Sequence, residues 1–474
     1  MEHPVVGLRP SSQRVRAARL ERLTPLDLSN LRVEDHGLPV HVAALLILDG
    51  APLLDAVGQL RLESVRANVG QRLHRAPRLR QVLAQGGFGL GPPAWVDDPG
   101  FDVAEHVRTR EVPSPGDEAA LLRVCSQLNE PPLDRSRPLW EMWLLTGLAD
   151  GTVGMLIRLH HVVADGTAAL AMIGALFDPG SDTPTEVAPA WVPAPGPGSG
   201  ELFSANVRDR ARAVAGALAL VRRPSVLFGR LAVYLRQVRQ LAREGLAPRV
   251  SLNRQAGKRR RLLLVRANLE DARTVAHGHG GKVNDVVLAA LAGGVRNLLD
   301  TRGELRPGLV IKASVAVSLR GAASERASGN LVGVMLVPLP VSEPDPARRL
   351  EEISKATAER KRQPPYQPSA RFLQRWMVRL MSRQRLVNLL VSDLAGPASP
   401  MFFTGSRVRE MFQVGVVQGN ITVSVGVLSY AGQLNFTIVA DADAAPDLPA
   451  LAAGLSADLR QLAGPAPGGP ASPD

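Results

Sequence analysis

The segment LHHVVADG, residues 159–166, contains two adjacent histidines, then an acid four residues after the second one, then a glycine. The apolar run that leads into it, 154–161, has the length and composition of a buried strand. Side chains alternate across a strand, so His161 is expected on the face of the apolar residues 153, 155, 157 and 159, and His160 beside Arg158. The two imidazoles are therefore predicted to point in opposite directions.

The end of the segment predicts a turn from this strand into a helix over 167–177. Asp165 is a favourable N-cap residue, and Gly166 gives the backbone freedom to turn. An alternative is that Asp165 lies away from the histidines and holds the loop through an ion pair.

The residue types narrow the chemistry that the histidines can support. A strand-borne pair that points apart cannot easily share one metal, and the chain has a single cysteine, so a zinc site is not expected. No G-x-S-x-G elbow is present, and GHGGKV (278–283) lacks the upstream glycine and the Ser/Thr of a P-loop. What remains is an imidazole acting as general base on a hydroxyl. A buried histidine satisfied within the core is the competing interpretation.

Composition indicates a globular chain of more than one domain. The 474 residues are 45% apolar and carry a formal net charge of +12, which favours anionic partners such as cofactor phosphates, lipid headgroups or nucleic acid. No apolar run approaches the ~18 residues of a membrane span. The N-terminus lacks the apolar core of a secretory signal, and one cysteine fits a reducing compartment, so a cytoplasmic location is expected.

The clearest break in the chain is the Pro/Gly-rich stretch 178–200, which is typical of a linker. Strand and helix patterns mix on both sides of it, which predicts a mixed α/β (α+β) fold with one domain on each side. The expected organisation is an N-terminal extension (1–22), an N-terminal domain (23–177), the linker (178–200), a basic helical region with a C-terminal domain (201–462), and a disordered tail (463–474).

Periodicity places the individual elements along this frame. Strands are expected at 42–50, 154–161, 262–267, 309–317, 331–339, 420–428 and 433–440. Helices are expected at 119–130, 167–177, 204–245, 284–300 and 370–391.

Two of the expected helices are rich in arginine. The 204–245 region is strongly basic, and 370–391 places arginines at positions 371, 375, 379 and 383 beside an apolar face. Such helices can lie on an anionic bilayer, although a helix packed on a sheet with a solvated arginine face is the alternative. Aromatic residues make up only 4% of the chain and no reading motif is present, so nucleic-acid binding is not expected.

At this point the motif can be compared with known families. His160-His161-x-x-x-Asp165-Gly166 resembles the HHxxxDG motif of the bacterial wax ester synthase/diacylglycerol acyltransferase family, within the chloramphenicol acetyltransferase-like superfamily. Peptide-synthetase condensation domains share that motif. The resemblance to the acyltransferases also rests on LTPLDLSNLRVED (23–35), Pro138-Leu139-Trp140, Asn284-Asp285, and the segments 329–340 and 420–441.

The resemblance implies two chloramphenicol acetyltransferase-like domains with an active-site channel between them. It implies an O-acyltransferase that moves a fatty acyl group from acyl-CoA to diacylglycerol or a long-chain alcohol. His161 would be the general base, His160 an orienting residue and Asp165 structural. Acyl-CoA would be a co-substrate, with no metal or other cofactor. The residues expected to bind substrate or shape the site are Pro138, Leu139, Trp140, Asn284, Asp285, Ser392, Asp393, Gly396 and Pro397.

Three of these expectations leave room for another role. Trp140 fits a core or channel-wall position better than chemistry, and Asn284 either caps its helix or shapes the site. The family pattern Ser-Asn-Val-Pro-Gly-Pro is replaced here by Ser392-Asp393-Leu-Ala-Gly396-Pro397. A carboxylate cannot donate the hydrogen bond that an asparagine amide donates, so this departure bears on activity and substrate range.

Two other functions stay open from the sequence. One is acyl transfer to a different hydroxyl or amine, as in condensation-like relatives, and the other is a catalytically degenerate homologue that binds lipid. The basic run 258–261 could meet the phosphates of CoA. With lipid substrates, the basic helices favour peripheral association with an anionic surface, either the inner face of the cell membrane or a lipid droplet.

Overall fold

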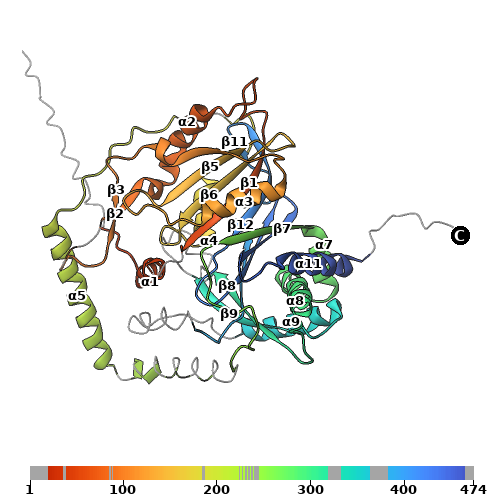
Figure 1. Cartoon of the computed structure of the whole chain (residues 1–474). Helices are drawn as coiled ribbons and strands as arrows, with labels where there is room; N and C mark the ends of the chain where they lie inside the picture. The colour runs from red at the N-terminus through yellow and green to blue at the C-terminus, as the bar shows by residue number, and fades with distance from the viewer. Residues whose placement is uncertain are drawn as a thin grey trace, which may run out of the picture.

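A computed structural model describes residues 20–464, apart from 36–38, 85–86, 88, 184–186, scattered positions between 224 and 244, 319–331 and 363–382. Two six-stranded sheets with covering helices, and a small two-stranded sheet of β2 (Gln81–Ala84) and β3 (Ala94–Asp97), make up the described part of the molecule (Figure 1). The predicted mixed α/β fold is confirmed. The predicted N-terminal extension up to residue 19 and the predicted tail from residue 465 lie outside the described residues.

The first sheet carries the histidine motif. Its strand order is β11-β12-β1-β6-β5-β4. β6 (Thr152–His160) lies between β1 (His41–Asp49) and β5 (Trp140–Thr146), and every residue of β6 is buried. The other elements of this half are α1 (Pro25–Glu34), α2 (Leu62–Arg72), η1 (Leu73–Arg75), η2 (Pro77–Arg80), β2 (Gln81–Ala84), β3 (Ala94–Asp97), η3 (Val103–Glu105), β4 (Val107–Glu111), α3 (Glu118–Asn129) and α4 (Gly166–Gly174).

The second sheet has the order β7-β14-β13-β10-β8-β9. Its helices gather on one face around α8 (Val283–Thr301), whose residues 286–292 are completely or almost completely buried. The remaining elements are α5 (Ser199–Val221), β7 (Arg260–Asn268), α7 (Leu269–Gly278), β8 (Ile311–Ser318), β9 (Val332–Leu339), α9 (Pro346–Lys361), β10 (Leu389–Ala395), β13 (Val423–Tyr430), β14 (Gln433–Asp441) and α11 (Leu448–Ala463).

Two strands from the C-terminal part of the chain complete the first sheet. β12 (Ser406–Val414) pairs antiparallel with β1, and β11 (Phe402–Phe403) pairs with β12. Phe412 of β12 packs in one apolar cluster with Leu45 of β1 and Val439 of β14. Sheet membership and chain order therefore differ, because β12 buries more apolar surface between the two sheets than it could at either outer edge.

The stretch predicted as a linker is held against the N-terminal half. Asp178 forms a pair with Arg72 and two backbone hydrogen bonds with Phe402. Further along, the ring of Trp191 lies edge-on to Phe101 at 6.2 Å and under the guanidinium of Arg80 at 4.4 Å. These contacts explain why the stretch leads α5 to one definite position at the edge of the molecule (Figure 1).

Most of the predicted strands and helices are present within a few residues, but the helix predicted at 370–391 is wrong at its end. Residues 363–382, including Arg371, Arg375 and Arg379, lie outside the described residues. Residues 389–391 belong to strand β10, which pairs in parallel with β8 and β13. A Leu-Leu-Val run fits a buried central strand, and periodicity does not separate such a run from helix. None of the described helices is long and apolar enough to cross a membrane.

Candidate active site

The histidine pair lies where β6 ends, in the middle of the first sheet. His160 is the last residue of the strand, and His161 is the first residue of the turn that follows, with its backbone N–H donating to Val40 O at 2.9 Å. Val153, Met155, Ile157 and Leu159 share one apolar cluster while Leu156 belongs to another, as strand alternation requires. Alternate residues of β6 therefore lie on opposite faces of the sheet up to the end of the strand, as predicted.

His160 is completely buried among polar groups. Its Nδ1 accepts the backbone N–H of Val162 at 3.1 Å, and its Nε2 lies 3.3 Å from Oε2 of Glu34. His41 is its cross-strand neighbour. Burial and the positive charge of Arg158 lower the pKa of His41 to about 3, so that ring is neutral. His160 is thus surrounded by protein rather than open to a substrate.

His161, by contrast, keeps some exposed surface. Burial lowers the pKa of its imidazole below 6.5, an effect to which the charge of His160 adds, while the nearby carboxylates of Asp165 and Asp27 oppose it. A lowered pKa keeps the ring neutral near pH 7, which is the form that can accept a proton.

Asp165 is the N-cap of α4, as one of the two sequence interpretations expected. Its Oδ1 accepts the Ala168 N–H and the Thr167 hydroxyl, each at 2.9 Å, and the residue is fully buried. A Cβ on Gly166 would lie 3.1 Å from a methyl carbon of Leu394, so glycine allows the start of α4 to approach β10 of the other sheet closely.

Replacing Asp165 by alanine is expected to lower the free energy of unfolding by about 1–2 kcal/mol, because the first turn of α4 loses its cap. Asp165→Asn should cost less, since the amide oxygen can still accept the two hydrogen bonds. Urea unfolding of the two variants measures the difference. An asparagine variant as unstable as the alanine variant would show that the charge, and not the cap, is what matters.

The Pro138-Leu139-Trp140 motif builds the wall beside β6. The Leu139 carbonyl accepts the His160 backbone N–H at 3.0 Å, which connects this motif directly to the histidines. Trp140 is almost completely buried, stacks on His106 with ring centroids 4.7 Å apart, and donates from Nε1 to Leu79 O at 2.7 Å. These contacts are those of a core residue.

Asn284 and Asp285 lie at the start of α8 in the second half. The N-cap is Lys282, so Asn284 is the second helical residue and not the cap. Asp285 is buried, and its carboxylate accepts the Lys282 N–H at 2.8 Å and the Thr357 hydroxyl at 2.7 Å. Among the described residues, Asp285 therefore fixes the start of α8, and Asn284 keeps a partly exposed side chain.

The segment that departs from the family pattern forms β10 and the turn after it. Ser392 accepts from Gln413 Nε2 at 2.8 Å. A Cβ on Gly396 would lie 2.3 Å from Ser429 O, so only glycine fits there, and Pro397 O accepts the Ala431 N–H at 2.9 Å. The Gly-Pro part of the pattern therefore serves the packing of β10 against β13.

Asp393 is largely buried, and burial raises the pKa of its carboxyl to about 6. A carboxyl whose pKa is 3.8 in the unfolded chain and about 6 in the folded one lowers stability as the pH rises through this interval. Below about pH 6 the group is protonated and can donate a hydrogen bond, as asparagine does.

Asp393→Asn is therefore expected to stabilise the protein above pH 6 by at most about 3 kcal/mol. The gain should shrink as the pH falls toward 4, where the aspartic acid is also neutral. Melting curves between pH 5 and pH 8 test this. Asp300→Asn makes the same chemical change at an exposed helical position and should show no pH-dependent gain. The same result for both variants would contradict the assignment.

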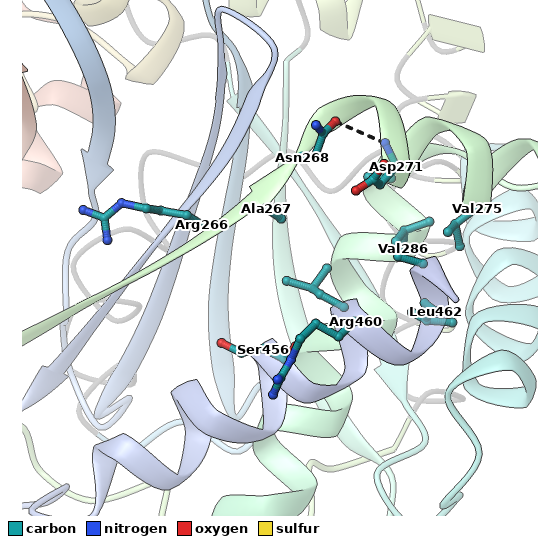
Figure 2. Close-up of a pocket in the computed structure, with 12 residues that line it drawn as sticks. Arg266, Ala267, Asn268, Asp271, Val275, Val286, Ser456, Arg460 and Leu462 are labelled. Carbon is teal, nitrogen blue, oxygen red and sulfur yellow. Dashed lines mark hydrogen bonds between the residues drawn. The ribbon is translucent and has the colours of Figure 1, made fainter. Parts of the chain in front are cut away.

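An apolar pocket lies at the seam between the two sheets, directly beside the motif. Leu159 and Gly166 border it from the motif, Leu394 and Leu428 from β10 and β13, and Gln413 is its polar lining residue. A different pocket, of about 190 Å³, lies between β7, α7 and α11 on the outside of the second half (Figure 2). It contains Arg266, Asp271 and Arg460 but no predicted site residue. A larger pocket of about 480 Å³ is lined by Pro138 and Trp140 together with charged residues such as Glu141 and Arg158, but by no residue of 159–166. We place the candidate site at the seam because Leu159 and Gly166 of the motif border it.

Three polar residues beside the histidines were not predicted: Glu34, His41 and Arg135. Glu34 ends α1, and Arg135 lies in the loop before the Pro-Leu-Trp motif. The signal in the sequence was Glu34 itself, next to the last residue of the LTPLDLSNLRVED segment. Among the described residues, no group of three or more His, Cys, Asp or Glu is arranged to hold a metal ion.

Two family models match this chain. The wax ester synthase/diacylglycerol acyltransferase catalytic domain matches residues 23–287, and the C-terminal domain of the same family matches residues 328–463. A probable diacylglycerol O-acyltransferase of Mycobacterium tuberculosis is 32% identical over 464 residues, covering 94% of this chain and 96% of the relative. A second, putative diacylglycerol O-acyltransferase of that species is 31% identical, covering 94% and 90%.

Solved structures agree on the fold. The wax ester synthase/diacylglycerol acyltransferase from Marinobacter aquaeolei VT8 superposes with a TM-score of 0.67 at 24% identity, covering 93% of this chain and 98% of the other. A starter condensation domain of rhizomide synthetase reaches a TM-score of 0.59 at 15% identity, covering 94% of both chains. On the family models and the mycobacterial relatives together, this chain belongs to the wax ester synthase/diacylglycerol acyltransferase family.

Proposed function

We propose that this protein transfers a fatty acyl group from acyl-CoA to the hydroxyl of diacylglycerol or of a long-chain alcohol, with His161 as the general base. The mycobacterial relatives are named as diacylglycerol O-acyltransferases, and the Marinobacter structure as a wax ester synthase as well. The observation that carries the proposal is His161 at the end of β6, which keeps some exposed surface and whose lowered pKa favours the neutral ring. The motif residues on either side of it, Leu159 and Gly166, border the apolar seam between the two sheets.

In this reaction His161 removes the proton from the acceptor hydroxyl as its oxygen attacks the thioester carbonyl. A carbon–oxygen bond forms, the carbon–sulfur bond breaks, and the imidazolium returns the proton to the departing CoA thiolate. The step balances without a metal, a redox cofactor or a covalent enzyme intermediate. Asp165 supports it indirectly, because its cap holds the helix that follows the turn.

The apolar pocket beside the motif has a volume of only about 30 Å³, so it marks an apolar seam between the sheets and not a cavity that holds a lipid chain. Its lining is aliphatic apart from Gln413, and both halves of the molecule contribute to it. An alkyl chain that lay along this aliphatic seam would gain roughly 0.8 kcal/mol for each methylene that it buries. A short polar acceptor would gain little from the same surface, which is the reason to expect a preference for long-chain substrates.

The test is an assay of the purified protein with long-chain acyl-CoA and separate acceptors: diacylglycerol, hexadecanol and a long-chain amine. Ester formation with either of the first two supports the proposal. Product from the amine alone would point to the chemistry of the condensation domains that share the fold. Binding of acyl-CoA without product from any acceptor would identify a degenerate lipid-binding member of the family.

We further propose that α5 brings the protein to an anionic membrane or lipid-droplet surface. Its first turns are docked, since Asn206 donates to Gly89 O at 2.6 Å and Leu202 O accepts from Arg22 at 2.8 Å. Beyond them, residues 207–219 are all exposed, and α5 runs along the edge of the molecule (Figure 1).

The exposed part of α5 has the pattern of an interfacial helix. Phe203, Val207, Val214 and Leu218 fall on one face and are 54%, 48%, 59% and 55% exposed. Arginines at positions 208, 210 and 212 add the charge that anionic headgroups attract, at about 1 kcal/mol for each basic residue near the surface.

Changing Val207, Val214 and Leu218 together to serine is expected to weaken sedimentation with phosphatidylglycerol vesicles at least several-fold, because the buried apolar area is lost. Turnover of diacylglycerol in vesicles should fall, and turnover of a water-soluble short alcohol should not. A matched control changes Val57, Val187 and Val192, which are 78%, 91% and 80% exposed elsewhere, to serine.

Equal vesicle binding by both triple variants would contradict a role for α5. A change in the molecular mass in solution, without vesicles, would instead assign the apolar stripe of α5 to contact with a second copy of the chain.

A further inference from the structure

A buried carboxylate from the start of the chain faces the first histidine of the motif. Glu34 is the last residue of α1, its side chain is 5% exposed, and its Oε2 lies 3.3 Å from Nε2 of His160, whose side chain has no exposed surface. Burying two ionisable groups this close together is costly, and removing one of them leaves the other buried without its partner.

The other side of the His160 ring fixes where its proton lies. Nδ1 accepts the backbone N–H of Val162, so a neutral His160 carries its proton on Nε2, the atom that faces Glu34. The ring is thus held by a hydrogen bond at Nδ1, while Nε2 lies 3.3 Å from the carboxylate oxygen without a well-formed hydrogen bond to it. Because Val162 is the second residue of the turn, this contact also ties the backbone next to His161 to the orientation of the His160 ring.

Arg135 holds the same carboxylate oxygen that faces His160. Its guanidinium donates to Glu34 Oε2 from Nε at 3.0 Å and from Nη2 at 2.7 Å, and to Asp35 Oδ1 at 2.8 Å. Burial raises the pKa of Glu34, but the interactions of its carboxylate with His160 and with the Arg135 guanidinium outweigh burial and bring the pKa to about 2. Glu34 is therefore ionised throughout the neutral range.

We infer that Glu34 is a positioning residue for acyl transfer: it fixes the tautomer and orientation of His160, and through the Val162 contact the geometry of the turn that presents His161. This inference rests on the proposed role of His161 as general base. It assigns His160 an accepting Nδ1, a protonated Nε2 and no contact with the reacting atoms.

Two other ionisable side chains lie near His160, and both make hydrogen-bond contacts with other groups. His41 of β1 and Arg158 of β6 lie near His160, and Arg158 donates to Glu141 and to Pro131 O, while His41 lies 3.1 Å from that carbonyl oxygen. The carboxylate of Glu34 lies 3.3 Å from Nε2 of His160. Its removal would take away the negative charge 3.3 Å from the buried Nε2, a loss that disfavours the tautomer with its proton on Nε2.

The first test compares steady-state kinetics of Glu34→Ala, Glu34→Gln and Asp35→Asn. Glu34→Ala should lower kcat by up to ~10²-fold, with little change in the KM for acyl-CoA, because a small displacement of the base affects the reaction and not substrate binding. Glu34→Gln keeps an acceptor oxygen and should recover part of the loss. Asp35→Asn alters the exposed partner of the same Arg135 and should leave kcat unchanged.

A double variant shows whether Glu34 acts on kcat through His160 or through the stability of the fold. If Glu34 acts through His160, the double variant Glu34→Ala/His160→Ala should be no slower than His160→Ala alone. Additive losses in kcat, or a kcat loss that follows the fraction of unfolded protein in every variant, would overturn the inference.

A second measurement does not depend on activity. Imidazole ¹⁵N shifts of the histidine-labelled protein, with the His160 signals assigned by their absence from His160→Ala, should show a protonated Nε2 and an unprotonated Nδ1. Glu34→Ala should shift or broaden them, and Asp35→Asn should not. Unchanged signals in Glu34→Ala would overturn the inference even in an active enzyme. An inactive wild type that shows the expected signals would overturn the proposed function alone.

Discussion

Replacing His161 by alanine is expected to lower acyl transfer by roughly 10²–10⁴-fold, since the general base is removed. The fold should persist, because His161 lies in the turn after β6 and retains exposed surface. Initial rates with long-chain acyl-CoA and diacylglycerol, normalised to folded protein, give the loss. The exposed His277 makes a matched control, and His277→Ala should be as active as the wild type.

His160→Ala should keep more activity per folded molecule than His161→Ala, because His160 orients and does not exchange a proton with the substrate. It should also be less stable, since it removes a completely buried side chain together with its contact to Glu34. Equal residual rates in the two variants, or a more damaging change at His160, would reverse the two assignments.

The pH dependence of kcat/KM gives a further test of His161 as the general base, because the direction of its pKa shift is known. Burial lowers the pKa of His161 below 6.5, so kcat/KM should fall with decreasing pH only below that value, as the ring becomes protonated. The acid limb should be present with both a long-chain and a short-chain alcohol, because it belongs to the enzyme. A midpoint above 6.5 would mean that another group limits the reaction.

The largest expected loss of stability follows from Asp178→Ala. Asp178 and Arg72 form a buried bidentate pair, with Nη2 to Oδ2 at 2.5 Å and Nε to Oδ1 at 3.3 Å, and their side chains are 8% and 4% exposed. Removing the carboxylate leaves the Arg72 guanidinium buried without this partner, which costs about 3–5 kcal/mol. Chemical denaturation monitored by tryptophan fluorescence measures the change.

Asp182→Ala is the control, because Asp182 is the next acid in the chain and is exposed. Its free energy of unfolding should match the wild type within about 0.5 kcal/mol. If Asp178→Ala were equally neutral, the stretch after α4 would be the loose linker that its composition predicts. Any loss of turnover in Asp178→Ala should disappear when rates are expressed per folded molecule, because the pair lies outside the site.

Local sequence determined the elements around the motif. The apolar run before His160 forms β6, and the Asp165-Gly166 pair ends the turn and starts α4, because strand alternation and helix capping depend on residues a few positions apart. The apolar pattern of α8 predicted its burial for the same reason. The Leu-Leu-Val run of β10 shows the limit of such signals, since an apolar run of that length fits either a strand or a helix.

The surroundings of His160 were decided by the tertiary structure. Glu34 and Arg135 are 101 positions apart, and both belong to segments whose local pattern shows only a helix end and a loop. Their meeting depends on how α1 and the Pro-Leu-Trp loop pack over the end of β6. Periodicity carries no information about such a contact, because it repeats over a few residues and pairing between distant segments does not.

The same reason explains how the two halves are joined. β12 pairs with β1 of the first sheet, and Trp191 of the Pro/Gly-rich stretch packs on Phe101. Composition alone predicts a free linker there and a boundary between domains. Sequence by itself thus determined the strand, the turn and the position of the histidine pair, and the general-base role of His161 is our proposal. The tertiary structure decided three features: the carboxylate beside His160, the apolar pocket at the seam and the stripe of α5 that stays exposed. Each depends on which distant segments pack together, and only the folded chain defines that.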